Sequence, residues 1–573
     1  MDYLRFAAMD YLLFVFMFGV SCIIGIYFGC FHKQTTTTDY LLGGRKMNVF
    51  PVSMSLVAST LSGVSLIAIP AEVYMHGFQI FVIVFSIFIS SIINYFVYLP
   101  VFYKIGLTSV NDYLEIRFDR TIKRITSILY IISCILLMPF LIYAPSLAFN
   151  QMSGIDMHII APVMTIICVF YTTIGGIKAV VWTDTLQFLI TLCTLAFVLV
   201  MGIVSVGGFS VIWTKSKSGD RLNIFNMDPD PTIRSSFWSV FIGNVFTWSS
   251  LVSVNPAGVQ RFISVSKLRD AKKVLAIFTV FAIAAKAINC FSGLIVYAKY
   301  SDCDPLTAKY MQKSDQIVPY YVKDVASQIP GISGLFVAGI FSTALSSLST
   351  QLNSVSGILY LDFMKPCMPV NISENKSSTI IKLLTILLGL LNVGFIFVIE
   401  QLGSLLELLS SAVGITGGPI LGAFTLGMLF PVANKKGTLV GIVSSLVVIS
   451  VIIIKNQIYV WNGDIKITPK PLNSYGCNKT EYDEQNRTVF STIQPDSDSI
   501  FWLYKLSFHY YVFIGTAITI IVGLLVSLCT KKKSDLGIDH ELFSPCLHRF
   551  RSSQRPEVDQ DLKLVKYTFS NKK

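Results

Sequence analysis

The sequence has few charged residues and no recognisable enzyme or metal motif. Only 14% of its 573 residues are Asp, Glu, Lys or Arg, whereas 53% are hydrophobic, which is too apolar for a soluble chain of this size. Its 11 cysteines include no Cys-x-x-Cys pair, and its six histidines are scattered, so zinc and haem sites lack their usual spacing. No nucleophile–base arrangement or phosphate-binding loop is evident. These absences argue against an enzyme and against a bound cofactor.

The formal charge of +12 is dispersed over short connections and the C-terminal tail. A nucleic-acid interface needs its Lys and Arg on one patch, so we expect no nucleic-acid partner. Runs of about 20 apolar residues can cross a bilayer, and the chain has many of them. The sequence therefore predicts an all-α polytopic protein whose surroundings are the lipid bilayer. The first run, 10–31, is too long for a signal-peptide core and is expected to be a retained helix.

Hydropathy predicts about thirteen transmembrane helices. They are expected at 10–31, 49–73, 79–104, 122–147, 157–175, 180–207, 236–256, 272–298, 331–361, 379–399, 403–430, 437–455 and 506–529. Connections rich in Lys and Arg alternate with connections that are not, and the positive-inside rule places the basic ones in the cytoplasm. The odd number of spans then puts the N-terminus outside the cell and the C-terminus inside.

The predicted outer loops carry two candidate modifications. The loop at 456–505 contains Asn478-Lys-Thr and Asn486-Arg-Thr, which have the pattern of glycosylation sites. Cys303 and Cys477 also lie on predicted outer loops, where a disulfide is chemically stable. Two free thiols would fit the sequence equally well.

Ionisable residues inside membrane spans are candidates for function. Lys286, in the stretch FAIAAKAINCF, lies near the middle of its predicted helix. Its ammonium either attracts an anionic substrate or pairs with Glu407 or a backbone carbonyl. Glu72 and Glu407 lie close to predicted outer ends, where hydration would suffice to stabilise them.

Two predicted spans are interrupted. The stretch SGVS at 62–65 weakens the helix at 49–73, and NPAG at 255–258 does the same to the span at 236–256. Irregular backbone at membrane depth is tolerated where it lines a cavity, and breaks at matching places in two halves mark transporter binding sites. These breaks lie five spans apart, which fits two inverted five-helix repeats. Two ordinary helix kinks are the alternative.

A hydroxyl-rich stretch, FSTALSSLSTQLNSVS, occupies 341–356. Thr343, Ser346 and Ser347 are spaced i, i+3 and i+4, so they share one face of a helix. Hydroxyl and carbonyl oxygens are hard ligands of the kind that an alkali cation prefers. Small polar residues also let helices pack closely, so the pattern fits either ion coordination or packing.

Three stretches resemble the sodium:solute symporter family. They are YTTIGGIKAVVWTDTLQF at 171–188, NPAGVQRFISVSKLRDAK at 255–272, and the hydroxyl-rich stretch, which continues NSVSGILYLDF. The resemblance extends over almost the whole chain. It implies a LeuT-like fold with a core of two inverted five-helix repeats, in which solute movement is coupled to Na⁺ running down its gradient. Sodium would be the only metal ion, and no cofactor is implied.

The resemblance also implies how the chain is divided. The expected parts are an outer N-terminus, leading helix and first inner loop at 1–48, the first repeat at 49–207, an outer loop at 208–235, the second repeat at 236–430, two further helices with the glycosylated loop at 431–529, and a basic cytoplasmic tail at 530–573.

In the family, a sodium site lies between the first broken helix and the eighth core helix. By position, the backbone carbonyls of Ala58 and Leu61 would join Thr343 and the hydroxyls of Ser346 and Ser347, the same side chains that share the hydroxyl face. The resemblance also places Asp184 near the inward sodium exit; a helix cap or an inner ion pair is its alternative role.

The expected solute is a small organic anion. The positions that bind sugars in relatives are Thr60, Ser65 and Ser410 here, so sugar ligands are absent. The stretches IPAEVYMHG (69–77) and LSSAVGITGGPILGAF (409–424) resemble the branch that carries monocarboxylates, biotin and pantothenate, or iodide. That branch usually has Arg where Met75 stands, so an outer basic residue is missing. The candidate substrate-binding residues are Ser62, Ser65, Trp248, Ser249, Ser253, Lys286, Ser410 and Ser411.

Each of these candidates has packing as its alternative role, and Trp248 is either a lid over the substrate or a core side chain. Together the residues predict a plasma-membrane symporter that imports a monocarboxylate or a vitamin by alternating access. A symporter of another solute, such as iodide or a sugar, is one alternative. A channel, or a transport-dead sensor that has kept the fold, is another.

Overall fold

The computed structural model is built from helices. It describes residues 6–31, 36–106, 109–311, 313–326, 329–369, 372–399, 405–465, 468–474, 476–477, 500–530 and 540–547. Within these ranges no β-strand occurs. A helix satisfies its own backbone hydrogen bonds, which is what a chain in hydrocarbon requires.

The described chain contains both long and short α-helices. The long helices are α1 (Ala8–Ile26), α3 (Val49–Thr60), α4 (Gly63–His76), α5 (Ile83–Ile93), α8 (Arg120–Ser153), α9 (Met157–Val206), α11 (Phe237–Trp248), α13 (Leu268–Tyr300), α15 (Ile332–Ile358), α16 (Glu374–Ile399), α17 (Leu405–Leu429), α18 (Lys435–Trp461) and α19 (Tyr511–Cys529). The short ones are α2 (Thr37–Leu42), α6 (Leu99–Ile105), α7 (Asp112–Arg117), α10 (Phe209–Ser218), α12 (Pro256–Ile263) and α14 (Ile317–Ala326).

The number of membrane crossings agrees with the expected thirteen. Among the described residues, 11 helices are long and apolar enough to cross a membrane, and the bent pair α3 and α4 makes a twelfth. Helix α9 is 50 residues long, about twice what one crossing needs. Its backbone leaves the helical region at Gly176, where φ is 54° and ψ is −159°. This kink divides α9 into the two spans that the sequence predicts.

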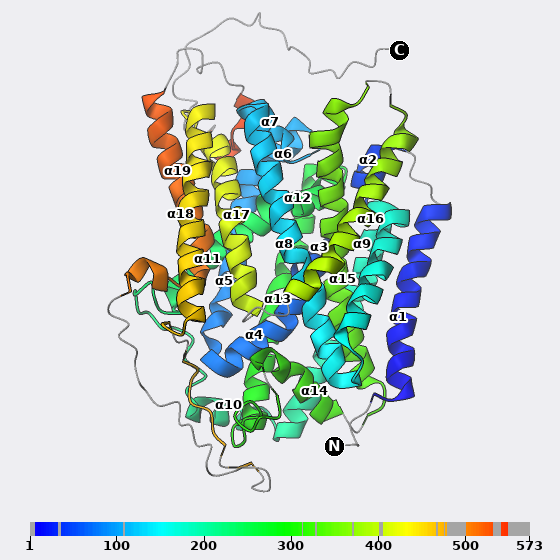
Figure 1. Ribbon diagram of the computed structural model, residues 1–573, viewed down its shortest axis with the longest axis vertical. Coiled ribbons are helices and arrows are strands. Elements are labelled where there is room, and N and C mark those ends of the chain that lie inside the picture. The colour runs from blue at the N-terminus through cyan, green and yellow to red at the C-terminus, as the bar shows by residue number, and fades with distance from the viewer. Residues whose placement is uncertain are drawn as a thin grey trace, which may run out of the picture.

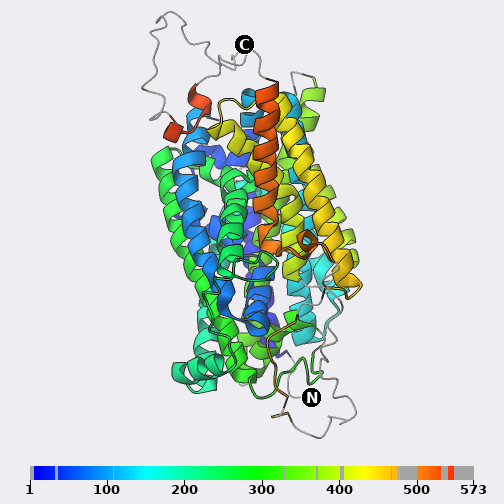
Figure 2. The ribbon, with the colours of Figure 1, turned by 90° about the vertical axis from the view of Figure 1, so that its left-hand side faces the viewer.

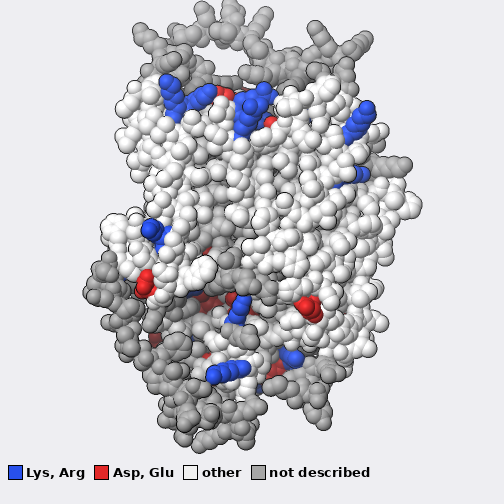
Figure 3. All heavy atoms as spheres, in the orientation of Figure 1, with Lys and Arg blue, Asp and Glu red and all other residues white. Residues whose placement is uncertain are grey.

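The outer surface of the bundle suits a lipid environment. Large apolar side chains point outward from several helices; Phe16 and Val204, for example, are 63% and 70% exposed. On the face drawn in Figure 3, Lys and Arg gather near the α7 end, and both signs of charge occur toward the α10 end. Most of the surface between them is uncharged, as a bilayer core demands.

The chain enters and leaves the bundle at opposite ends. Helix α1 begins at the end where α14 lies, and α19 finishes at the end where α7 lies (Figure 1). This arrangement follows from an odd number of crossings. Helices α18 and α19 run side by side along one flank of the bundle (Figure 2).

The first predicted break is present between α3 and α4, which meet at an angle of 54°. Helix α3 ends at Thr60, and Ser62 begins α4 as its N-cap, accepting a hydrogen bond from the Ser65 amide. A Cβ on Gly63 would lie 2.9 Å from the carbonyl oxygen of Ile340, so glycine permits the close approach of α15. Pro70 lies within α4 without ending it.

The second predicted break follows α11. The chain forms a π-helical turn at Ser249–Val254, and α12 begins at Pro256. Asn255 caps α12 by accepting a hydrogen bond from the Ala257 amide at 2.9 Å. A proline at the first helical position loses no hydrogen bond, because that amide has no partner within a helix.

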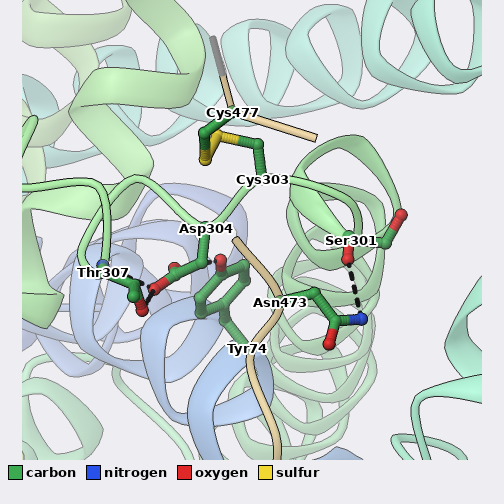
Figure 4. Close-up of a disulfide and its surroundings, with 7 residues drawn as sticks. All are labelled: Tyr74, Ser301, Cys303, Asp304, Thr307, Asn473 and Cys477. Atoms are coloured by element: carbon green, nitrogen blue, oxygen red, sulfur yellow. Dashed lines mark hydrogen bonds between the residues drawn. A yellow bond between two sulfur atoms is a disulfide. The ribbon is translucent and has the colours of Figure 1, made fainter. Parts of the chain in front are cut away.

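A disulfide joins Cys303, after α13, to Cys477, after α18, with 5.0 Å between their Cα atoms. Figure 4 shows Asp304 beside it, accepting a hydrogen bond from the Tyr74 hydroxyl at 2.5 Å and another from the Thr307 amide at 2.7 Å. Since Tyr74 belongs to α4, the disulfide-linked loops hold the far end of the first broken helix. The predicted glycosylation sites Asn478 and Asn486 lie outside the described residues.

Part of the C-terminal tail is anchored to the α7 end of the bundle. The Tyr113 hydroxyl donates to the carbonyl of Leu542 at 3.1 Å, and the Ser544 amide donates to that of Met428 at 3.1 Å. Phe543 is only 4% exposed. A tail expected from its composition to be polar therefore contains a short buried segment.

Candidate functional site

The hydroxyl face of α15 is buried at the first break. Thr343, Ser346 and Ser347 are at most 2% exposed. The Thr343 hydroxyl donates to the Ile340 carbonyl at 2.8 Å. The Ser347 hydroxyl lies 3.0 Å from the carbonyl of Thr343 and 3.0 Å from that of Ser59. Both hydroxyls point their protons at carbonyls, which leaves oxygen lone pairs for a cation.

Ser347 thus brings α15 against the last turn of α3. Ala58, next to Ser59, is 0% exposed, and Leu61 is 1% exposed. The last carbonyls of a helix have no partner within it, so the end of α3 adds carbonyl oxygens to the hydroxyls of α15. Neutral oxygens of these two kinds are suited to an alkali cation.

Ser346 faces a different neighbour, Asp184. Its hydroxyl lies close to the Asp184 carboxylate, although the geometry is not that of a hydrogen bond. Asp184 is 0% exposed; it accepts a hydrogen bond from Ser55 at 2.5 Å and forms an ion pair with Arg261 at 2.9 Å. Arg261 also donates to Ser55 at 2.8 Å and to the Thr350 hydroxyl. A single buried cluster therefore ties together α3, α9, α12 and α15.

The candidate substrate residues at the first break are held by local hydrogen bonds. The Ser65 hydroxyl donates to the Ser62 carbonyl at 2.9 Å, and the Ser65 carbonyl accepts from Asn289 of α13 at 2.6 Å.

At the second break, Ser249 shares a hydrogen bond with Ser90 at 3.1 Å. Ser253 is buried and its hydroxyl has no partner among the described residues. Ser253 is thus the hydroxyl at this break that a solute can engage without breaking another bond.

The remaining serine candidates lie on α17. Ser411 is buried, and no described group pairs with its hydroxyl; Ser410 is its neighbour. The Ser250 hydroxyl donates to the Gly417 carbonyl at 3.1 Å, which fixes α17 against the second break. Ser410 and Ser411 are more than one turn from Gly417, so they are displaced along the helix from this contact.

Trp248 and Lys286 lie together. The Lys286 ammonium is 5.7 Å from the centre of the Trp248 ring, and the ring of Phe278, also on α13, has its centre 6.5 Å from that of Trp248. The alternative pairing of Lys286 with Glu407 is wrong, because Glu407 pairs with Arg234 at 3.3 Å.

Arg234 is a basic residue that no sequence motif marked, and it pairs with two acidic side chains. It lies in the loop before α11, only 2.8 Å from Glu72 of α4 and 3.3 Å from Glu407 of α17. Glu72 is 6% exposed, so an ion pair and not hydration stabilises it. Burial lowers the pKa of Arg234, but the Glu72 and Glu407 carboxylates outweigh burial and raise it above its ordinary value.

Arg234 and Arg261 were both missed as partners because each pairs across a long stretch of sequence. Arg261 carried a signal, since it is the one charged residue inside the NPAGVQRF stretch. Arg234 carried none, because its loop matches no motif.

The family model for the sodium:solute symporter family matches residues 40–444. The chain belongs to the sodium:solute symporter family. It is accordingly a sodium-coupled symporter of a small organic solute, and Na⁺ is its coupling ion.

Curated members of this family are similar over nearly the full chain. Sodium-coupled monocarboxylate transporter 1 of Xenopus laevis is 38% identical, covering 94% of this symporter and 90% of the relative. The Homo sapiens protein of that name is also 38% identical, covering 92% and 88%. The sodium-dependent multivitamin transporter of Oryctolagus cuniculus is 33% identical, covering 92% and 83%.

A solved structure supports the fold. The symporter matches a Na⁺-coupled sialic acid symporter, solved in a substrate-bound outward-open state, with a TM-score of 0.75 over 92% of this chain and 98% of that chain. The sequence identity is 24%, so this similarity supports the fold and nothing more. It agrees with the expected LeuT-like core of ten helices.

The Arg234 cluster allows a stability test. Replacing Arg234 by Met leaves the buried Glu72 and the half-buried Glu407 carboxylates without their partner, and we expect the free energy of unfolding to fall by about 3 kcal/mol. Chemical or thermal unfolding of the detergent-purified protein measures this. The double variant Glu72→Gln with Arg234→Met should recover part of the loss.

Lys273 provides the matched control. Its ion pair with Asp270 is 3.4 Å long and its side chain is 56% exposed, so Lys273→Met should leave stability unchanged within about 0.5 kcal/mol. If Arg234→Met were no more harmful than Lys273→Met, the Arg234 cluster would not be a stabilising contact.

Proposed function

We propose that this symporter imports a small organic anion, a monocarboxylate or a vitamin such as biotin or pantothenate, across the plasma membrane by alternating access. The observation that carries the proposal is the 38% identity to sodium-coupled monocarboxylate transporter 1, which covers nine-tenths of both chains. The multivitamin transporter at 33% identity supports the wider class of organic anions. Lys286, a buried cation near both breaks, gives an anion a reason to bind.

We propose the α3–α15 contact as the sodium site. The ligands would be the backbone carbonyls of Ala58 and Leu61 together with the oxygens of Thr343, Ser346 and Ser347. The hydrogen bond from Ser347 to Ser59 supports this assignment, because it brings the two helices within reach of one ion. Neutral ligands bind sodium weakly enough for it to leave again.

Asp184 is proposed to lie on the inward sodium exit path. A sodium ion leaving the hydroxyl face would pass Ser346, whose hydroxyl is beside the Asp184 carboxylate. Arg261 then has a role as well, since it neutralises Asp184 between ions and keeps the carboxylate from holding sodium too tightly.

The proposed substrate cavity lies between the two breaks. Its candidate residues are Ser62, Ser65, Trp248, Ser249, Ser253, Lys286, Ser410 and Ser411. The free hydroxyls of Ser253 and Ser411 are the strongest serine candidates, because both are buried without a partner in the described part of the chain.

The proposed orientation places the α7 end in the cytoplasm and the N-terminus outside the cell. Basic residues of the α7 end, among them Lys104, Arg120 and Lys435, support it. The disulfide between Cys303 and Cys477 then lies in the oxidising exterior, as do Asn478 and Asn486. In this proposal the two inverted repeats occupy 49–207 and 236–430.

Uptake into cells tests the proposed function. Labelled lactate, pyruvate, biotin, pantothenate, iodide and glucose are supplied with and without external sodium. We expect saturable, sodium-dependent accumulation of at least one organic anion and none of glucose. Accumulation of iodide alone would shift the substrate to an inorganic anion, and uptake that neither saturates nor requires sodium would indicate a channel. No sodium-dependent uptake of any compound would overturn the proposal for this panel.

The sodium site has its own test. The double variant Ser346→Ala with Ser347→Ala removes two ligand oxygens, so we expect the sodium concentration for half-maximal uptake to rise about tenfold, the cost of roughly one lost polar contact. Surface labelling checks that the protein still reaches the membrane.

Ser356→Ala is the control for this variant. The Ser356 hydroxyl donates to the Asn353 carbonyl within α15 at 3.1 Å, away from α3, and its loss should leave sodium dependence unchanged. Equal sodium dependence in the double variant and in Ser356→Ala would refute the site.

A further inference from the structure

Lys286 is the one buried base of the described residues that lacks a counter-charge and a hydrogen-bond acceptor. Arg261 pairs with Asp184 at 2.9 Å, Arg117 donates to the Gly427 carbonyl at 3.0 Å, and Arg221 donates to the Tyr74 carbonyl at 3.0 Å. Lys286 is 4% exposed, and its ammonium lies over the Trp248 ring and near the Cys290 thiol. An uncompensated charge inside a membrane protein is costly and is kept where it serves function.

The position of Lys286 along α13 places it at the first break. Three residues further along this helix, Asn289 donates to the carbonyl of Ser65 at 2.6 Å, and Ser65 lies in the first turn of α4. Residues at i and i+3 share a helix face, with a rise of about 4.5 Å between them. Lys286 is therefore about one turn from this contact, level with the gap between α3 and α4.

Lys286 also lies beside the helix that leads to the second break. The Trp248 ring, 5.7 Å from the ammonium, belongs to the last residue of α11 and directly precedes the π-turn Ser249–Val254. The ammonium thus lies between the first turn of α4 and the end of α11, the helix that leads through the π-turn to the second break at Asn255. No carboxylate of the described chain is available to it there, since Glu407 and Glu72 are both engaged by Arg234.

The surroundings of Lys286 fit one ligand chemistry. An ammonium binds a carboxylate strongly when both are removed from water. Trp248 adds an apolar ring face against which a short acyl or ring group packs, and Ser253 in the second break has a hydroxyl without a described partner. A cationic substrate does not fit this place, because the Lys286 ammonium would repel it at short range.

We propose that Lys286 receives the carboxylate of the transported anion and that Trp248 packs against the remainder of the molecule. This inference rests on the proposed import of organic anions and adds its charge-selecting group. The proposal also places the sodium ion and the substrate carboxylate at different sites. Sodium is held by neutral oxygens where α15 meets α3, whereas the substrate carboxylate is neutralised by α13, so the carboxylate is not a sodium ligand.

The test compares anions with uncharged analogues of the same shape. Lactate and biotin are measured against lactamide and biotinamide as competitors of labelled lactate or biotin uptake. In Lys286→Met we expect the KM for the anion to rise at least about 30-fold, the usual effect of removing one partner of a buried charge pair. The preference for the anion over its amide should disappear, and half-maximal sodium should change less than about twofold, because neutral oxygens elsewhere hold the ion.

Two further variants separate charge from structure. Lys286→Arg keeps the charge and should retain the preference for anions. Lys382→Met is the matched control, because Lys382 also lies over an aromatic ring, 5.9 Å from the centre of Tyr40, but on α16; we expect wild-type KM values. If Lys286→Met kept both the wild-type KM and the preference for anions, the assignment would be overturned.

Chemical modification of a cysteine variant tests the assignment even if Lys286→Met folds poorly. Lys286→Cys is treated at the cell surface with an aminoethyl methanethiosulfonate, which rebuilds an ammonium, or with the methyl reagent, which does not. Return of anion preference with the amine reagent alone supports the proposal, and equal behaviour with both contradicts it. If the wild type accumulates none of the anions with sodium, the proposed function fails and this inference with it. If the wild type transports the anion and Lys286→Met behaves like the wild type, only the Lys286 assignment is refuted.

Discussion

Unpaired backbone groups at membrane depth are the constraint on which this structure depends. A bilayer offers no water to satisfy them, yet α3 ends at Thr60 and the π-turn that follows α11 ends at Val254, both inside the bundle. Side chains of neighbouring helices form hydrogen bonds with some of these backbone groups. Ser347 donates to Ser59 at the end of α3, and Asn289 donates to Ser65 at the start of α4. In the proposed function, the oxygen atoms that these side chains leave free bind the ion and the solute.

The distribution of charge follows from the same constraint. The buried pair Asp184–Arg261 binds helices together at one end of the first break, and the Arg234 cluster joins α4 to α17 at the other. In the proposed function, these ion pairs lie at the two ends of the solute path and must change when the transporter opens. Lys286 lies between them without a counter-charge. In this account the solute supplies the missing charge, so binding of solute and closure of the path are favoured together.

Local patterns in the sequence predicted much of this architecture. Hydropathy gave the crossings, Gly and Pro marked both breaks, and helical spacing selected Thr343, Ser346 and Ser347 from a stretch of hydroxyls, because each signal lies within one helix. The ion pairs were not predictable, since Arg234 and Glu72 are 162 residues apart and Arg261 and Asp184 are 77 apart. Their spacing along the helix could not show that Ser346 and Ser347 contact different neighbours. Only tertiary packing directs one toward Asp184 and the other toward α3.

The central claim is that sodium and solute bind on two sides of one broken helix and move together. The most direct test uses the purified symporter in proteoliposomes that hold equal sodium on both sides, with a trace of ²²Na⁺ outside. An inward gradient of the transported anion should then speed the entry of ²²Na⁺ into the vesicles, because at equal total sodium the solute gradient is the only source of free energy for net sodium movement. Entry of ²²Na⁺ at the same rate with and without the anion gradient would contradict the account.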